Sequence, residues 1–144
     1  MKKTESMKET ISATWLNGLA FESEVDGHKI YMDSSPEHGG KNTGPRPKPL
    51  MMVALAGCTG MDVAAILGKM RENVEEFTVE VEGEVTEEHP KRFEGMKIIY
   101  RVKGQGINRK NVEKAVHLST TRYCGVSANY SQAFPITHEI IFED

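Results

Sequence analysis

Two cysteines are the residues whose chemistry matters most in this sequence. Cys58 lies in an apolar run, and its small neighbours Gly57, Thr59 and Gly60 would let another backbone or a small substrate approach the sulfur. Cys124 stands where a helix is predicted to begin, and a helix N-terminus stabilises a thiolate. Free cysteine is also among the most buried residue types. The residues alone therefore leave two interpretations open: a redox pair, or two separate core thiols.

Few other residues suggest chemistry. Asp62 follows Cys58 by four residues and so shares its side of a helix, where it either orients a group near the sulfur or caps a contact between helices. The histidines have no spacing typical of a zinc site: His28, His38, His89, His117 and His138. We therefore expect no metal and no cofactor.

Length and composition indicate one small domain. The 144 residues fit a single domain over residues 1–144, of which 1–9 are expected to be flexible. A net charge of −3 gives no electrostatic reason to expect binding to nucleic acid or to an anionic membrane. Two cysteines cannot form a secreted disulfide scaffold, and the basic N-terminus lacks the apolar core of a secretory signal. We expect a cytoplasmic protein.

The apolar run Leu50–Leu67 has the length of a membrane span, with Asp62 as its only charge. Three features argue against a span: a carboxylate near a bilayer centre costs about 3 kcal/mol, Gly57 and Gly60 weaken an isolated helix, and the flanking segments alternate as strands of a soluble sheet do. We interpret the run as a helix from Pro49 to about Arg71 that is buried in protein, and we expect no membrane partner.

The remaining elements follow from periodicity and turn signals. The prediction is a meander, two alternating strands, a helix that begins at Asn108, a short helix and a last strand: Thr10–Leu16, Leu19–Val25, His28–Met32, 77–85, Glu94–Lys103, 108–121, Cys124–Ala133 and Ile136–Phe142. Asn17-Gly18 and Asp26-Gly27 are the expected turns. The segment Asp33–Pro49 holds four prolines and three glycines, so it is predicted to be irregular, either as a functional loop or as a surface connector.

In combination, several motifs resemble the OsmC/Ohr family over nearly the whole chain from Thr10. They are Gly44-Pro45-Arg46-Pro47, Leu50, the run from Ala54 to Val63 around Cys58, Tyr123-Cys124-Gly125-Val126-Ser127-Ala128, and Pro135-Ile136. The resemblance implies an α+β fold with long central helices packed against curved antiparallel sheets. It also implies an intertwined homodimer with a site near each subunit interface.

The resemblance further implies a chemistry. Cys58 matches the cysteine that attacks a small organic hydroperoxide as a thiolate and becomes a sulfenic acid. Cys124 matches the resolving cysteine, which condenses with the first to a disulfide. A dithiol reductant of the lipoyl or thioredoxin type then resets the pair.

The sequence departs from the family at the groups that activate the first cysteine. The family glutamate would fall at Lys48 or Pro49, so no carboxylate is present there. Arg46 is the only arginine before Cys58 and is expected to supply the activating cation, with Glu37 as the candidate carboxylate. The alternative is a thiol protein that is not a peroxidase: a redox sensor, or a binder of an apolar ligand.

Overall fold

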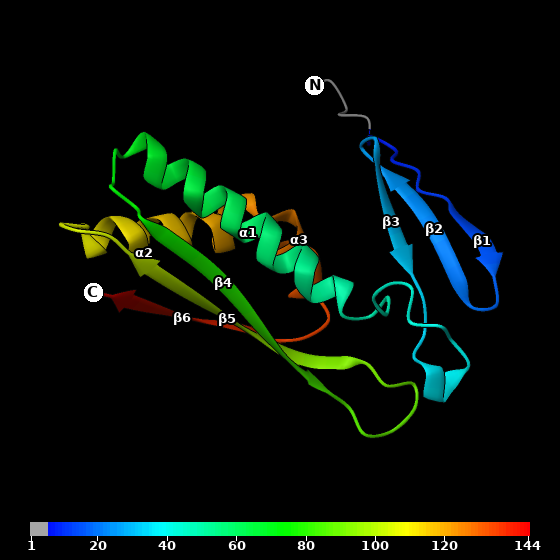
Figure 1. Ribbon diagram of the computed structural model, residues 1–144. Helices are drawn as coiled ribbons and strands as arrows, with labels where there is room; N and C mark the ends of the chain where they lie inside the picture. Colours follow the sequence, from blue (N-terminus) through cyan, green and yellow to red (C-terminus); the bar gives the residue numbers. More distant parts are fainter. Residues whose placement is uncertain (1–5) are drawn as a thin grey trace. The chain divides into compact units, whose positions relative to one another are not determined.

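The computed structural model describes residues 6–144, which divide into two compact units: the residues up to Leu50, and Met51–Asp144 (Figure 1). The expected flexibility of residues 1–9 falls partly on residues 1–5, which lie outside the described part. The elements along the chain are β1 (Ala13–Asn17), β2 (Ala20–Val25), β3 (His28–Met32), η1 (Pro36–His38), α1 (Leu50–Lys69), β4 (Glu76–Val85), β5 (Phe93–Lys103), α2 (Arg109–Leu118), η2 (Ser119–Tyr123), α3 (Gly125–Tyr130) and β6 (Ile136–Glu143).

The first unit contains the predicted antiparallel meander in the order β1-β2-β3. Asp26 and Gly27 both have positive φ, 51° and 80°, as a two-residue hairpin turn requires. The first hairpin differs from the prediction at its strand ends, since β1 begins three residues after Thr10 and β2 begins one residue after Leu19. Asn17 belongs to β1, and the pairing of β1 with β2 shifts register between Trp15 and Asn17.

The connector after β3 is more ordered than predicted, since η1 forms a helical turn inside it. Its organising group is Asp33, whose carboxylate accepts hydrogen bonds from the backbone N–H groups of Ser34, Lys41 and Thr43 and from the Thr43 hydroxyl. These bonds, led by those from Thr43, lower the pKa of Asp33 from 3.8 to about 2. One ionised side chain thus fixes the loop.

The second unit is built on a three-stranded sheet in the order β4-β5-β6. β4 and β5 pair antiparallel, as predicted, but β6 runs parallel to β5. The expectation of purely antiparallel sheets is therefore wrong here. The chain between β5 and β6 passes through α2, η2 and α3, and such a helical crossover returns the chain in the same direction.

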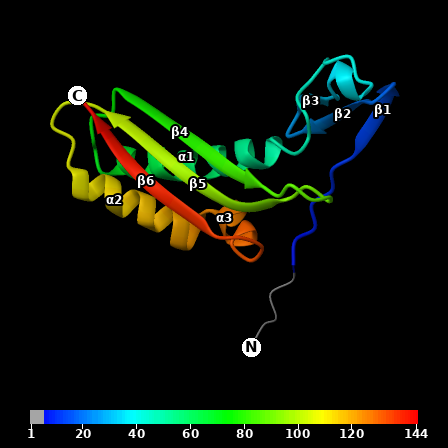
Figure 2. The same cartoon turned by 90° about the horizontal axis from the view of Figure 1, so that it is seen from below.

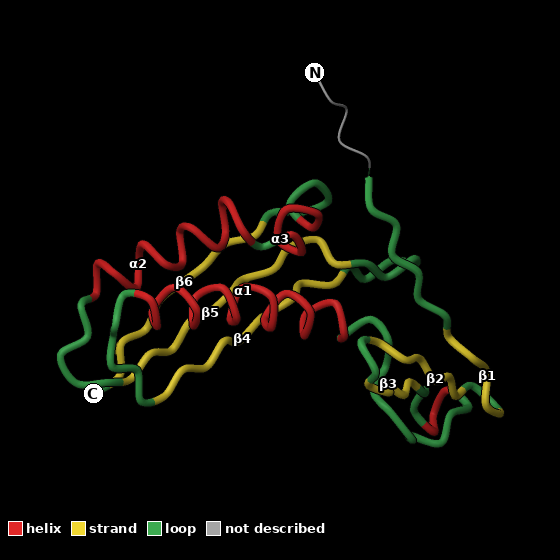
Figure 3. The backbone as a smooth tube through the Cα atoms, turned by 90° about the horizontal axis from the view of Figure 1, so that it is seen from above, coloured by secondary structure: helices red, strands yellow, loops and turns green. Residues whose placement is uncertain are grey.

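The two faces of this sheet follow the predicted alternation. Alternate residues of the three strands join one core cluster with residues of α1 and α2, so both helices cover the same face (Figures 2 and 3). The opposite face carries ion pairs: Arg101 contacts Glu80 at 2.7 Å and Glu143 at 3.5 Å, and Lys97 contacts Glu139 at 2.8 Å. The sheet therefore has one dry and one wet face.

Helix α1 buries only one stripe within a single chain. Leu55, Thr59, Val63 and Leu67, spaced four residues apart, face the core, whereas Met61 is 75% exposed. The other sides of α1 are not covered within a single chain, so the burial of the whole helix in protein stays a prediction that involves a second chain. By length and composition α1 could also cross a membrane, although the core helix of a soluble protein meets the same criterion.

The helix after β5 is interrupted where a continuous one was predicted. Asn108 caps α2 by accepting a hydrogen bond from the N–H of Lys110, as predicted. The inward stripe at Val112, Ala115 and Val116 is buried. At Ser119, however, the helix widens into the π-helical turn η2, which ends at Tyr123. Such π turns are frequent at functional sites.

Candidate functional site: a cysteine pair beside a carboxylate

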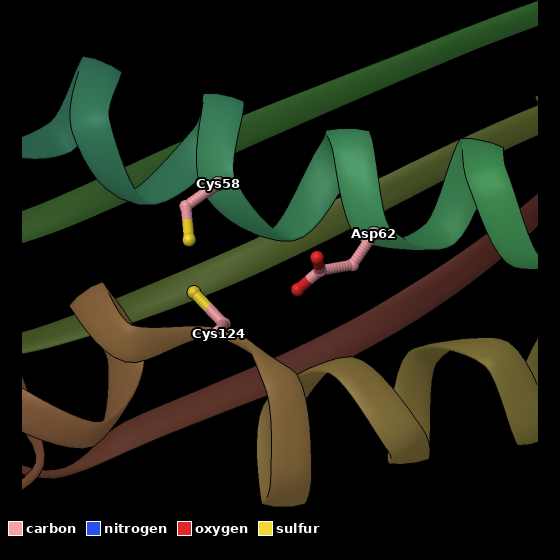
Figure 4. A group of neighbouring side chains, drawn as sticks. All are labelled: Cys58, Asp62 and Cys124. Carbon is pink, nitrogen blue, oxygen red and sulfur yellow. The ribbon is translucent and has the colours of Figure 1, made fainter.

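Helix α1 presents Cys58 and Asp62 on adjacent turns of one face. Both side chains are half-buried and point toward the segment that joins η2 to α3 (Figure 4). Thr59, next to Cys58, belongs to the fully buried stripe of the helix. The helical spacing of four residues therefore places the sulfur and the carboxylate side by side.

Cys124 is positioned by the end of one helical turn and the start of another helix. Its backbone N–H donates to the carbonyl of Ser119 at 2.8 Å, which closes η2. Its sulfur caps α3 by accepting a hydrogen bond from the N–H of Ser127 at 3.3 Å. The predicted position of Cys124 at a helix start is confirmed, and the residue is only 4% exposed.

The structure brings these groups together although 66 positions separate the cysteines in the sequence. The sulfurs of Cys58 and Cys124 and a carboxylate oxygen of Asp62 all lie within 4.8 Å of one another (Figure 4). Both cysteines are free thiols. The sulfurs point toward each other, so a small movement would bring them to bonding distance.

The two thiols differ in their electrostatic surroundings. Burial raises the pKa of the Cys124 thiol to about 11, and its hydrogen bond with Cys58 acts in the same direction. The N–H of Ser127 opposes this rise but does not cancel it. The expected effect of the helix start on the Cys124 thiolate is present, but burial outweighs it. Near neutral pH Cys124 stays protonated and can donate its S–H to the sulfur of Cys58.

A buried row of hydroxyl groups ends at Asp62. The Ser119 hydroxyl donates to Oδ2 of Asp62 at 2.9 Å, Thr59 lies 2.8 Å from Ser119, and the Tyr100 hydroxyl lies 2.7 Å from Thr59. Hydrogen bonds among Ser119, Thr59 and Tyr100 were not predicted from the sequence. The only sequence feature that could have indicated this row is the presence of two polar residues, at positions 59 and 62, in an otherwise apolar helix.

Arg46 and Glu37 belong to the first unit. The guanidinium of Arg46 donates to Oδ1 of Asn42 at 2.7 Å and to the carbonyl of Gly44 at 2.9 Å, so the loop holds it in place. Arg46 also lines an open pocket of about 440 Å³ with apolar walls that include Leu19 and Phe21. Glu37 lies exposed in η1. The roles of both residues beside Cys58 stay predictions.

The same three groups could also surround a metal ion by geometry alone, since two sulfurs and an oxygen are donors that suit zinc. Metal binding requires thiolates, which a bound ion would itself favour. A disulfide would use both sulfurs, so metal binding and disulfide formation exclude each other at this cluster.

Fold and site together define a class of protein: an α+β domain with a pair of facing thiols between its central helix and the segment after η2. Comparison with known proteins gives the family. The model of the OsmC-like protein family matches residues 39–139, and the chain belongs to this family.

Individual relatives agree with this assignment. The chain is 35% identical to Protein YhfA of Escherichia coli K12 over 125 residues, which cover 86% of this chain and 90% of the relative. A hypothetical protein from Aquifex aeolicus matches with a TM-score of 0.80 and 28% identity, over 96% of this chain and all of that one. An organic hydroperoxide resistance protein OsmC from Legionella pneumophila matches with a TM-score of 0.67 and 18% identity, over 94% and 99%. The last likeness concerns the fold alone.

Proposed function

We propose that the protein is a thiol-dependent peroxidase that reduces small organic hydroperoxides through Cys58 and Cys124. One observation carries the proposal: two free thiols lie within 4.8 Å of each other, one accessible and the other buried. A single chain thus holds both an attacking and a resolving sulfur. The family includes proteins described as organic hydroperoxide resistance proteins, such as that of Legionella pneumophila, which supports this choice of substrate.

The proposed cycle has two steps before reduction. The Cys58 thiolate attacks the distal peroxide oxygen, the O–O bond breaks, and the alkoxide leaves with a proton as an alcohol. Cys58 is then a sulfenic acid. The Cys124 sulfur attacks the Cys58 sulfur, hydroxide leaves with the Cys124 proton as water, and a disulfide remains. A dithiol of the lipoyl or thioredoxin type reduces that disulfide and becomes oxidised itself.

We include three further elements in the proposal. Arg46 supplies the cation that favours the Cys58 thiolate, with Glu37 as its carboxylate partner. The protein acts as a homodimer, since much of α1 stays uncovered in one chain. It works in the cytoplasm, where reducing conditions keep such a pair available.

Stopped-flow oxidation with cumene hydroperoxide tests the proposal. Cys58→Ser should abolish peroxide consumption, and Cys124→Ser should allow one turnover and leave a sulfenic acid that dimedone traps. Arg46→Ala should slow the first step about tenfold, because loss of the cation leaves less of Cys58 as thiolate. Arg92→Ala, which removes an arginine from the β4–β5 hairpin, is the matched control and should react as the wild type does. A Cys58→Ser variant with the wild-type rate would disprove the peroxidase assignment.

A second candidate function has one specific observation in its favour. The pocket beside Arg46 combines apolar walls with two charged groups, Arg46 and Asp33, which suits an apolar ligand with a polar end. If wild-type protein fails to consume peroxide but binds a fluorescent fatty acid, and Arg46→Ala weakens that binding, ligand binding becomes the better assignment.

A further inference from the structure

The hydroxyl row beside the cysteines has a fixed direction. Ser119 donates its only hydroxyl proton to Asp62, so it must accept the hydrogen bond from Thr59. Thr59 has then used its proton and must accept from Tyr100. Every donor therefore points toward Asp62, and this arrangement stabilises an ionised carboxylate.

We propose that Asp62 is the base that removes the thiol proton of Cys124 as this sulfur attacks oxidised Cys58. The proposal deepens the proposed function and rests on the formation of a disulfide between the two cysteines. It assigns a catalytic role to a residue for which the sequence left two roles open, orienting a group near the sulfur or capping a contact between helices.

The step balances in atoms and charge. The Cys124 S–H bond breaks and its proton goes to the Asp62 carboxylate, while the Cys124 sulfur bonds to the Cys58 sulfur. The S–O bond of the sulfenic acid breaks, and the leaving hydroxide takes the proton from Asp62 to form water. Asp62 ends as a carboxylate again, and the net products are a disulfide and one water molecule.

The distances suit this transfer. The carboxylate oxygen lies within 4.8 Å of both sulfurs, a span that one water molecule or a small side-chain rotation bridges. The same oxygen group therefore reaches the sulfur that loses a proton and the sulfur that carries the leaving hydroxide. No second residue is needed to return the proton.

A base is required because the resolving thiol does not ionise readily. Burial raises the pKa of the Cys124 thiol, so little thiolate forms near neutral pH. Unaided attack would be slower in proportion. A carboxylate beside the thiol removes the proton during attack and avoids forming the free thiolate.

Among the described residues, the other titratable groups around the pair are not suited to accept the Cys124 proton. Tyr100 on β5 and Tyr130 on α3 both have a pKa raised by burial, so they stay protonated near neutral pH. His138 on β6 contacts the ring of Tyr100 edge-on, at 6.3 Å between ring centroids. Cys58 is itself the electrophile in this step. Asp62 is thus the acceptor that the geometry supplies.

A mixed disulfide isolates the step from peroxide chemistry. Ellman's reagent should label Cys58 first, because Cys124 is buried, and Cys124 then attacks and releases a second thionitrobenzoate. Thionitrobenzoate departs as a stable anion and needs no proton. The rate of the second release therefore depends on removal of the Cys124 proton and not on a proton given to the leaving group. Cys124→Ser protein should stop after the first release, which verifies the labelled position.

Asp62→Asn keeps an oxygen for the Ser119 hydroxyl but cannot accept the proton, so it should slow the second release about 100-fold. Asp62→Glu should recover part of the rate. Glu72→Gln is the matched control, since it removes the same charge from a hydrogen-bonded carboxylate beyond the C-terminal end of α1. It should keep the wild-type rate. A second release from Asp62→Asn within twofold of wild type would overturn the proposal.

The pH profile separates proton transfer from a structural role. With Asp62 present the second release should vary little between pH 6 and pH 8, on the order of twofold, because the carboxylate and not hydroxide removes the proton. In Asp62→Asn it should rise about tenfold per pH unit, since only hydroxide removes the proton. A parallel, pH-independent loss in Asp62→Asn would indicate mere misplacement of Cys124. Wild-type protein that resolves the mixed disulfide through Asp62 but ignores peroxide would contradict the peroxidase assignment alone.

Discussion

The hydroxyl row predicts a specific cost for Thr59→Val. Threonine and valine are both β-branched and nearly the same shape, so the substitution changes the packing little and removes one hydroxyl. Thr59, Ser119 and Tyr100 are each 0% exposed, so water cannot replace the lost partner. The Tyr100 hydroxyl is left without an acceptor, which costs about 2 kcal/mol, and Ser119 loses the bond that it accepts, about 1 kcal/mol. We expect a loss of about 3 kcal/mol in the free energy of unfolding.

The double variant Thr59→Val/Tyr100→Phe provides the internal check. Tyr100→Phe alone should cost about 1 kcal/mol, because Thr59 still donates to Ser119. In the double variant no hydroxyl is stranded, so the loss should be about 2 kcal/mol rather than the additive 4 kcal/mol. Urea unfolding followed by circular dichroism, at one protein concentration for all four proteins, measures this coupling. Additive losses, or a Thr59→Val loss below about 0.5 kcal/mol, would refute the assigned hydrogen-bond directions.

Two further predictions concern the loop and the assembly. Because the pKa of Asp33 is lowered from 3.8 to about 2, its stabilisation of the loop is fully present above pH 4 and is lost as the pH falls toward 2. Hydrogen exchange of the loop amides should show this loss, and Asp33→Asn should lack the amide protection at neutral pH. Equal protection in Asp33→Asn and wild type would contradict the role of Asp33. Light scattering should give about twice the chain mass of 16.1 kDa. Met61 is exposed in the single chain, so if α1 is buried in the dimer interface, Met61→Lys should weaken the dimer roughly tenfold or more. A stable monomer of wild-type protein would contradict the dimer.

The elements that the sequence predicts well are those whose pattern is local. The alternation in β4 and β5 follows from one wet and one dry face, and the Asp26-Gly27 turn follows from residues that tolerate positive φ. Asn108 was recognisable as a cap from its side chain. These features depend on neighbours within a few residues, so a single sequence carries them.

The features that were missed depend on distant contacts. The parallel pairing of β6 with β5 depends on where the crossover delivers the chain, which no residue of β6 reveals. The pKa of Cys124 was expected to fall at a helix start, but burial against α1 decides it. The roles of Ser119 and Tyr100 arise from contacts 57 and 41 positions away in the sequence, with Asp62 and Thr59. Neither side chain indicates, from its neighbours in the sequence, that it takes part in such a contact.

The difference in burial between the two sulfurs orders the proposed chemistry independently of any resemblance. A peroxide must reach the attacking sulfur from solvent, and Cys58 is half-buried whereas Cys124 is 4% exposed. The high pKa of Cys124 would also make it a poor first nucleophile. Once Cys58 is oxidised, however, these properties become useful, since a protonated and shielded Cys124 cannot be oxidised by a second peroxide before it attacks. Exchanging the roles would leave the reactive thiolate where no substrate reaches it, so attack by Cys58 and resolution by Cys124 is the order that the site supports.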